Sequence, residues 1–190
     1  MRKKSHISVA KGIIHELGDS DSINHRFSFY IGSIWPDCVP SFLTRRHCMD
    51  ETYELFVKKM EKFVRKYDVK KEMNIRSTWR MGIVMHYIAD YFTFPHNKHF
   101  EGNFKQHCMY EKELKHRMYE YIDSIKCGET LCERTLLKDI SDIKDYIRSY
   151  HESYVEQSGN VDIDCEYTLA VCLGVFASLL SIASGKVCIE

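Results

Sequence analysis

The sequence is poor in residues that interrupt helices, and neither sign of charge is in excess. Its 190 residues include only three prolines and nine glycines, so long uninterrupted elements are expected. Lys+Arg and Asp+Glu both number 27, which gives a formal net charge of zero. This balance argues against the broad basic field that non-specific binding to duplex nucleic acid requires. The length suits one domain over residues 1–190, and 44% hydrophobic residues can build a sizeable core.

The sequence also lacks a CxxC pair, although it contains eight cysteines. The closest two are Cys127 and Cys132, with four residues between them. They are interpreted as two cysteines around a turn at Gly128, and a thiolate zinc site is the alternative. Because no export signal is evident, the cysteines are expected to be reduced thiols in a cytoplasmic protein.

Neither an export signal nor a transmembrane segment is predicted. The chain begins Met-Arg-Lys-Lys, but the hydrophobic stretch that should follow is broken by His6, Lys11 and Glu16. The uncharged run from Tyr167 to Gly185 is only just long enough to cross a bilayer. We interpret this run, which contains Gly174 and several serines, as a buried core helix.

Apolar residues recur with the helical period almost throughout, which predicts an all-α, single-domain helical bundle without strands. Ser5 is expected to cap a first helix that ends near Leu17. A polar loop over 18–24 and a short helix over 25–34 should follow, before Pro36 and Pro40 force an irregular stretch that delivers His47. The remaining helices are predicted at 49–67, 73–92, 104–126, 134–156 and 163–184.

Two of these predicted helices carry charged and imidazole groups where their apolar stripes should continue. In the helix at 73–92 the stripe on one face is Ile75, Trp79, Ile83, His86 and Asp90. In the helix at 104–126 it is Phe104, His107, Glu111, Leu114, Met118, Tyr121 and Ile125. A buried unpaired carboxylate is costly, and the usual remedies are a partner or a metal ion.

The spacing of these groups suits metal ligands. Residues four apart on a helix have Cβ atoms roughly 5–6 Å apart, so His107 and Glu111 can share one ion. Pro95 should end the preceding helix and let His96 turn back toward them. A lone histidine on an apolar face is usually a hydrogen-bonded core residue, but two such pairs and a third histidine predict a metal site. Mixed imidazole and carboxylate ligands are typical of catalytic zinc, although iron and manganese accept similar donors.

The order of these residues resembles the zinc-dependent phospholipase C family and its relatives, the fungal single-strand-specific nucleases. The resemblance is carried by Ser5-His6, Gly32-Ser33-Ile34-Trp35-Pro36-Asp37 with His47 ten residues later, His86-Tyr87-Ile88-Ala89-Asp90, Pro95-His96, and His107 with Glu111.

The resemblance implies three metal ions. The first would be held by Asp37, His47, His86 and Asp90, and the second by His96, His107 and Glu111. The third would use His6, a shared Asp90, and the amine and carbonyl of the N-terminal residue. The family has a processed tryptophan there; this chain has Met1, five residues before His6, as in the nuclease branch. The implied catalytic residue is Asp37, which would orient or deprotonate the attacking water.

The expected function is therefore hydrolysis of phosphate esters, in the manner of a phospholipase C phosphodiesterase that uses two or three zinc ions. The substrate class includes phospholipid headgroups. Cys38 and Thr44 stand where the phospholipases place aromatic residues for choline, so a preference for choline is not expected. Arg45 and Arg46 are candidates for phosphate contact or for a solvated face. The alternatives are a single-strand nuclease and a non-catalytic metal-binding protein; the sequence gives no indication of oligomeric state.

Overall fold

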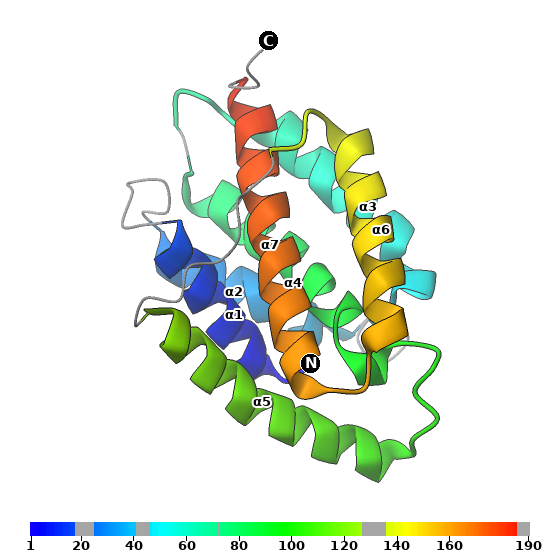
Figure 1. The fold of residues 1–190 in the computed structure, drawn as a ribbon. Helices are drawn as coiled ribbons and strands as arrows, with labels where there is room; N and C mark the ends of the chain where they lie inside the picture. Colours follow the sequence, from blue (N-terminus) through cyan, green and yellow to red (C-terminus); the bar gives the residue numbers. More distant parts are fainter. Residues whose placement is uncertain (18–24, 41–45, 72, 127–135, 186–190) are drawn as a thin grey trace.

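The computed structural model describes residues 1–17, 25–40, 46–71, 73–126 and 136–185, and every regular element in these ranges is helical. The predicted all-α fold is confirmed (Figure 1). The α-helices are α1 (Lys3–Glu16), α2 (Arg26–Ile34), α3 (Met49–Lys66), α4 (Ile75–Tyr91), α5 (Phe104–Lys126), α6 (Ile140–Gln157) and α7 (Val161–Ser184). Two short 3₁₀ helices, η2 (Trp35–Cys38) and η4 (Phe94–His96), follow α2 and α4.

The helix α7 forms the centre of the bundle and packs against α1, α3, α4, α5 and α6. By length and composition it could cross a membrane, but most of its apolar stretch is buried inside this fold. Leu169, Val175, Phe176 and Leu179 are completely buried there. This burial supports the interpretation of the uncharged run as a core helix, whose apolar surface the other helices cover.

The first helix begins earlier than predicted, and the expected cap at Ser5 is wrong. The N–H groups of Ser5 and His6 both donate to the carbonyl of Arg2, so the helix already begins at Lys3. Ser5 is buried inside the first turn, and its hydroxyl has no hydrogen-bond partner there. This earlier start places His6 on the first turn of α1, close to the amino group of Met1.

Other helix ends differ by a few residues, because caps outside the apolar period set them. The Asn74 side chain accepts from two N–H groups of the first turn, so α4 begins at Ile75. Asp139 caps α6 in the same way, and this helix begins at Ile140 rather than at 134. The predicted loop over 18–24 and the pair Cys127 and Cys132 lie outside the described residues.

The first residues of the two predicted stripes point outward instead of inward. Ile75 is 61% exposed and Phe104 is 84% exposed, because each begins its helix beyond the end of the packed core. The second half of α4 is buried on every side rather than along one stripe. His86 and Asp90 therefore lie deep in the protein, where water cannot solvate them.

A close crossing of α2 and α4 depends on two glycines. A Cβ atom at Gly32 would lie 2.2 Å from the carbonyl oxygen of Trp79, and one at Gly82 would lie 2.5 Å from that of Phe29. Both distances are too short for any side chain, so the two backbones are in direct contact. The crossing brings the carbonyl of Ser33 within 2.8 Å of the His86 ring.

Replacing Gly82 with alanine should lower the free energy of unfolding by about 1–3 kcal/mol, because backbone atoms must move apart. Urea denaturation measures this change. The matched control is Gly12→Ala, where the new Cβ would meet the flexible end of the Ile122 side chain. That side chain can rotate away, and the better helix propensity of alanine offsets the cost. Equal losses in the two variants would contradict the role assigned to the crossing.

Candidate metal centre

The structure brings together all eight side chains predicted to bind metal, from six segments of the chain. They are His6 on α1, Asp37 on η2, His47 just before α3, His86 and Asp90 on α4, His96 on η4, and His107 and Glu111 on α5. Asp37, His47, His86 and Asp90 form one group, and His96, His107 and Glu111 form another. Within each group, one potential ligand atom per residue lies within 4.8 Å of all the others.

In the first group, two histidines meet two carboxylates. His86 Nε2 lies 3.1 Å from Asp90 Oδ2 and 3.6 Å from Asp37 Oδ1. His47 Nδ1 lies 3.2 Å from the same Asp90 oxygen and 3.5 Å from Asp37 Oδ1. On the other side of its ring, His86 Nδ1 donates to the Ser33 carbonyl, which leaves the Nε2 lone pair directed at the carboxylates. A histidine held in this way is typical of metal ligands.

In the second group, Glu111 lies between two histidines. Its Oε1 is 3.4 Å from His96 Nε2 and 3.3 Å from His107 Nε2. His96 Nδ1 donates to the carbonyl of His47 over 3.2 Å, so its Nε2 faces Glu111. This bond also ties the second group to the first.

The amino group of Met1 lies between the two groups. Its nitrogen is 2.7 Å from Asp90 Oδ1, 2.7 Å from His96 Nε2 and 3.0 Å from Glu111 Oε1. Burial alone would lower the pKa of this amine, but Asp90 and Glu111 outweigh burial and raise it. Burial would likewise raise the pKa of Asp90, yet the amine and His96 hold it well below its ordinary value.

His6 provides an independent sign that the site suits a metal ion. Its side chain is 2% exposed, and neither ring nitrogen makes a hydrogen bond among the described residues. Its Nε2 lies 3.4 Å from Asp90 Oδ1. Burial and the neighbouring His86 lower the pKa of His6 to about 4, so its imidazole is neutral near pH 7 and offers a lone pair. Buried polar atoms normally have partners, and an ion bound to Asp90 would supply one.

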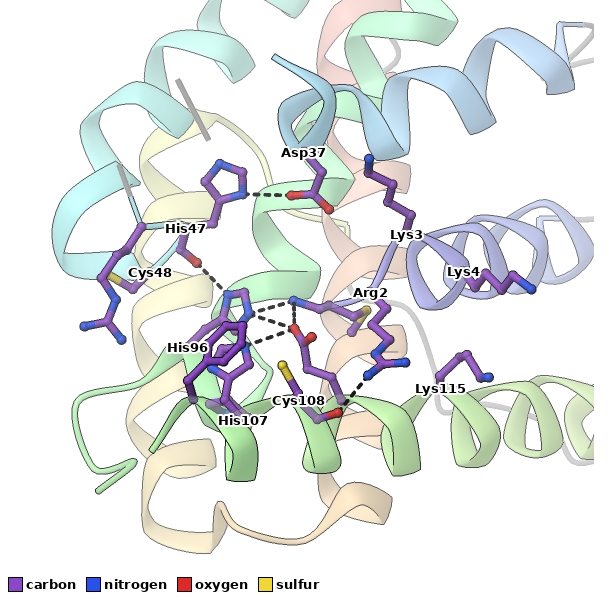
Figure 2. Close-up of a pocket in the computed structure, with 15 residues that line it drawn as sticks. Arg2, Lys3, Lys4, Asp37, His47, Cys48, His96, His107, Cys108 and Lys115 are labelled. Atoms are coloured by element: carbon purple, nitrogen blue, oxygen red, sulfur yellow. Dashed lines mark hydrogen bonds and ion pairs between the residues drawn. The ribbon is translucent and has the colours of Figure 1, made fainter. Parts of the chain in front are cut away.

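A cavity of about 800 Å³ opens beside these groups (Figure 2). It is large enough for a small organic molecule. His6, His86 and Asp90 are not part of its lining, whereas members of both groups reach its surface. The described residues that line the cavity are Met1, Arg2, Lys3, Lys4, Asp37, Arg46, His47, Cys48, Pro95, His96, Phe104, His107, Cys108, Glu111 and Lys115.

Asp164 was missed by sequence reasoning, although it supports η4 and thereby His96. Its carboxylate accepts from the N–H of Phe94 and from the hydroxyl of Tyr154. Burial raises the pKa of Asp164 to about 6, despite these hydrogen bonds. The signal was present, since an acid on the apolar helix α7 is as unusual as Asp90 on α4. It was obscured because acids are common in the first turn of any helix.

The residues predicted to influence substrate choice are described only in part. Arg46 lines the cavity, and Cys38 is exposed without being part of the lining. Thr44 and Arg45 lie outside the described residues.

Comparison with known proteins assigns the chain to a family. The family model described as zinc dependent phospholipase C matches residues 5–161. Searches among curated proteins and among solved structures found no match. The matched region covers most of the chain and contains the seven side chains of the two groups as well as His6. The chain therefore belongs to the zinc-dependent phospholipase C family.

Proposed function

We propose that this protein hydrolyses phosphate esters, as a phospholipase C-like phosphodiesterase that uses two or three zinc ions to activate water. The proposal rests mainly on one observation: two clusters of imidazole and carboxylate side chains both reach the surface of the same cavity. Structural zinc sites are usually closed by cysteines, whereas mixed ligands with access to solvent are typical of catalytic zinc. Iron or manganese would accept the same donors.

The proposed ligands follow the two groups and the position of Met1. Asp37, His47, His86 and Asp90 would hold the first ion, and His96, His107 and Glu111 the second. His6, Asp90 and the amine and carbonyl of Met1 would hold the third. The third assignment is supported by the Met1 nitrogen 2.7 Å from Asp90 and by the unpartnered ring of His6.

Bound zinc would lower the pKa of water and stabilise the charge that develops on the phosphoryl oxygens. The protein's own contribution centres on Asp37, which lines the cavity while most of the acids and histidines of its group lie deeper. Asp37 Oδ1 faces His47 and His86, and Oδ2 lies 3.9 Å from His6 Nε2. From this position the carboxylate can orient a water molecule in the cavity and accept its proton at Oδ2.

Asp37→Asn should lower kcat by roughly 100-fold or more, because an amide cannot accept the proton. The fold should be retained, since Asp37 is not part of the hydrophobic core. Turnover of a chromogenic phosphodiester and circular dichroism measure the two effects. Asp145→Asn, an exposed acid on α6, is the matched control. A fully active Asp37→Asn variant would refute the role of this residue.

The purified protein should contain two or three zinc ions per chain, and chelation should abolish hydrolysis until zinc is restored. His107→Ala should remove about one ion, because it leaves the second group with two ligands. Elemental analysis measures the occupancy, and His116→Ala, an exposed histidine on the same helix, is the control. Hydrolysis that persists in metal-free protein would exclude this mechanism.

Adding a few residues before Met1 should lower the occupancy by about one ion, since the amine would become an amide with no lone pair to donate. The same residues added after Glu190 serve as the control. Metal content by native mass spectrometry distinguishes the two forms. Unchanged occupancy in the extended protein would eliminate Met1 as a ligand.

The two alternative functions give different results in the same assays. A nuclease would cleave single-stranded DNA faster than small phosphodiesters. A metal-binding protein without turnover would be fully loaded with metal and inactive toward every ester tested.

A further inference from the structure

Basic side chains surround the cavity that contains the proposed metal ligands. Arg2, Lys3 and Lys4 lie at the start of α1, Arg46 lies before α3, and Lys115 lies on α5. In the described part of the lining, the acids are Asp37 and Glu111, and both belong to the two metal-binding groups. Because the whole chain carries equal numbers of acidic and basic residues, this clustering is a local feature.

These cations are not neutralised by the described part of the protein. Elsewhere, basic residues form ion pairs with acids; the Lys98 ammonium, for example, lies 2.8 Å from the Asp50 carboxylate. No described carboxylate forms an ion pair with the side chains of Lys3, Lys4, Arg46 or Lys115, and the Arg2 guanidinium donates to the carbonyl of Cys108. The acids of the metal-binding groups contact histidines and the Met1 amine instead. The four side chains are therefore available to an anion in the cavity.

The same lining is unfavourable for a cationic headgroup. A quaternary ammonium group binds well against aromatic faces or an uncommitted carboxylate. Among the lining residues that the structure describes, the only Phe, Tyr or Trp is Phe104, which is 84% exposed at the rim. Lysines near the scissile phosphate would repel such a group, whereas they would attract a second anion.

We propose that the preferred substrate carries a second anionic group besides the phosphate that is cut, and that Lys4 and Lys115 bind this group. The proposal rests on the phosphate-ester hydrolysis proposed above. Lys4 and Lys115 come from the neighbouring helices α1 and α5, and Figure 2 shows them on the same flank of the cavity, while Lys3 lies beside Asp37. The second group on the substrate would belong to an anionic phospholipid headgroup or to a small soluble ester.

The test compares p-nitrophenyl phosphodiesters whose second alcohol carries a phosphate, a hydroxyl or a trimethylammonium group. With the zinc-loaded protein, kcat/KM should be at least about tenfold higher for the phosphate ester than for the trimethylammonium ester. Equal rates, or a preference for the trimethylammonium ester, would overturn this inference and leave the proposed function standing. If none of the three esters is hydrolysed, the proposed function itself fails.

The double variant Lys4→Gln, Lys115→Gln should lower the preference for the phosphate ester over the hydroxyl ester about tenfold, at unchanged zinc content. Because the contact is electrostatic, added salt should reduce the preference of the unmodified protein as well. Lys112→Gln is the matched control, since Lys112 is exposed on α5 and does not line the cavity. An undiminished preference in the double variant would refute the assignment of these two lysines.

The source of the second anion is distinguished with vesicles. Faster cleavage in cardiolipin vesicles than of soluble glycerol bisphosphate esters identifies a lipid headgroup, and the reverse order identifies a soluble ester. Phosphatidylcholine vesicles are the control and should be cleaved more slowly than cardiolipin vesicles. Cleavage of a single-stranded oligonucleotide faster than either anionic ester would overturn the assignment to a small or lipid-borne anion.

Discussion

The buried carboxylate of Asp90 is the group around which the rest of the structure is arranged. An ionised carboxylate without partners cannot be removed from water at an acceptable cost, and α4 is buried on all sides where Asp90 lies. Its two oxygens are therefore met by the Met1 amine, His6, His47 and His86, each within 3.4 Å. The segments that pack around α4, including α1 and the start of α3, thus supply the partners that this one carboxylate requires. A metal ion held by the same donors would compensate that charge more completely.

The helical period predicts the fold and the two polar pairs of the site, whereas His6, Asp37 and His47 were inferred from the resemblance to the phospholipase C family. The period identified His86 with Asp90 and His107 with Glu111 as polar pairs in apolar seams, and the structure brings them together. It could not locate the start of α1, because the backbone hydrogen bonds to Arg2 set that start. Nor could the period show that Ile75 and Phe104 are exposed, since exposure depends on where neighbouring helices end.

Contacts between segments that are distant in the chain could not be predicted from the sequence. The carbonyl that orients His86 belongs to Ser33, and it is within reach only because Gly32 and Gly82 let two backbones touch. The sequence alone does not show which other helix a glycine allows to approach closely. Of the basic residues around the cavity, the sequence pointed only to Arg46, because the others come from the start of α1 and from α5, which are distant in the chain. Chemistry in this site would thus depend on buried histidines and acids, and selection among substrates on a separate, more exposed set of cations.

The Asp164 carboxyl behind η4 has a consequence for how the protein responds to pH. Because burial raises its pKa from 3.8 to about 6, the folded state binds this proton more tightly than the unfolded state does. This stabilisation is complete below pH 3.8, the pKa in the unfolded state, and is lost as the pH rises through about 6. The free energy of unfolding falls by about 3 kcal/mol at most over this range. Yet the ionised form accepts stronger hydrogen bonds from Phe94 and Tyr154. As the pH rises toward neutral, the free energy of unfolding therefore falls, while the hydrogen bonds to Asp164 that hold η4, and with it His96, become stronger.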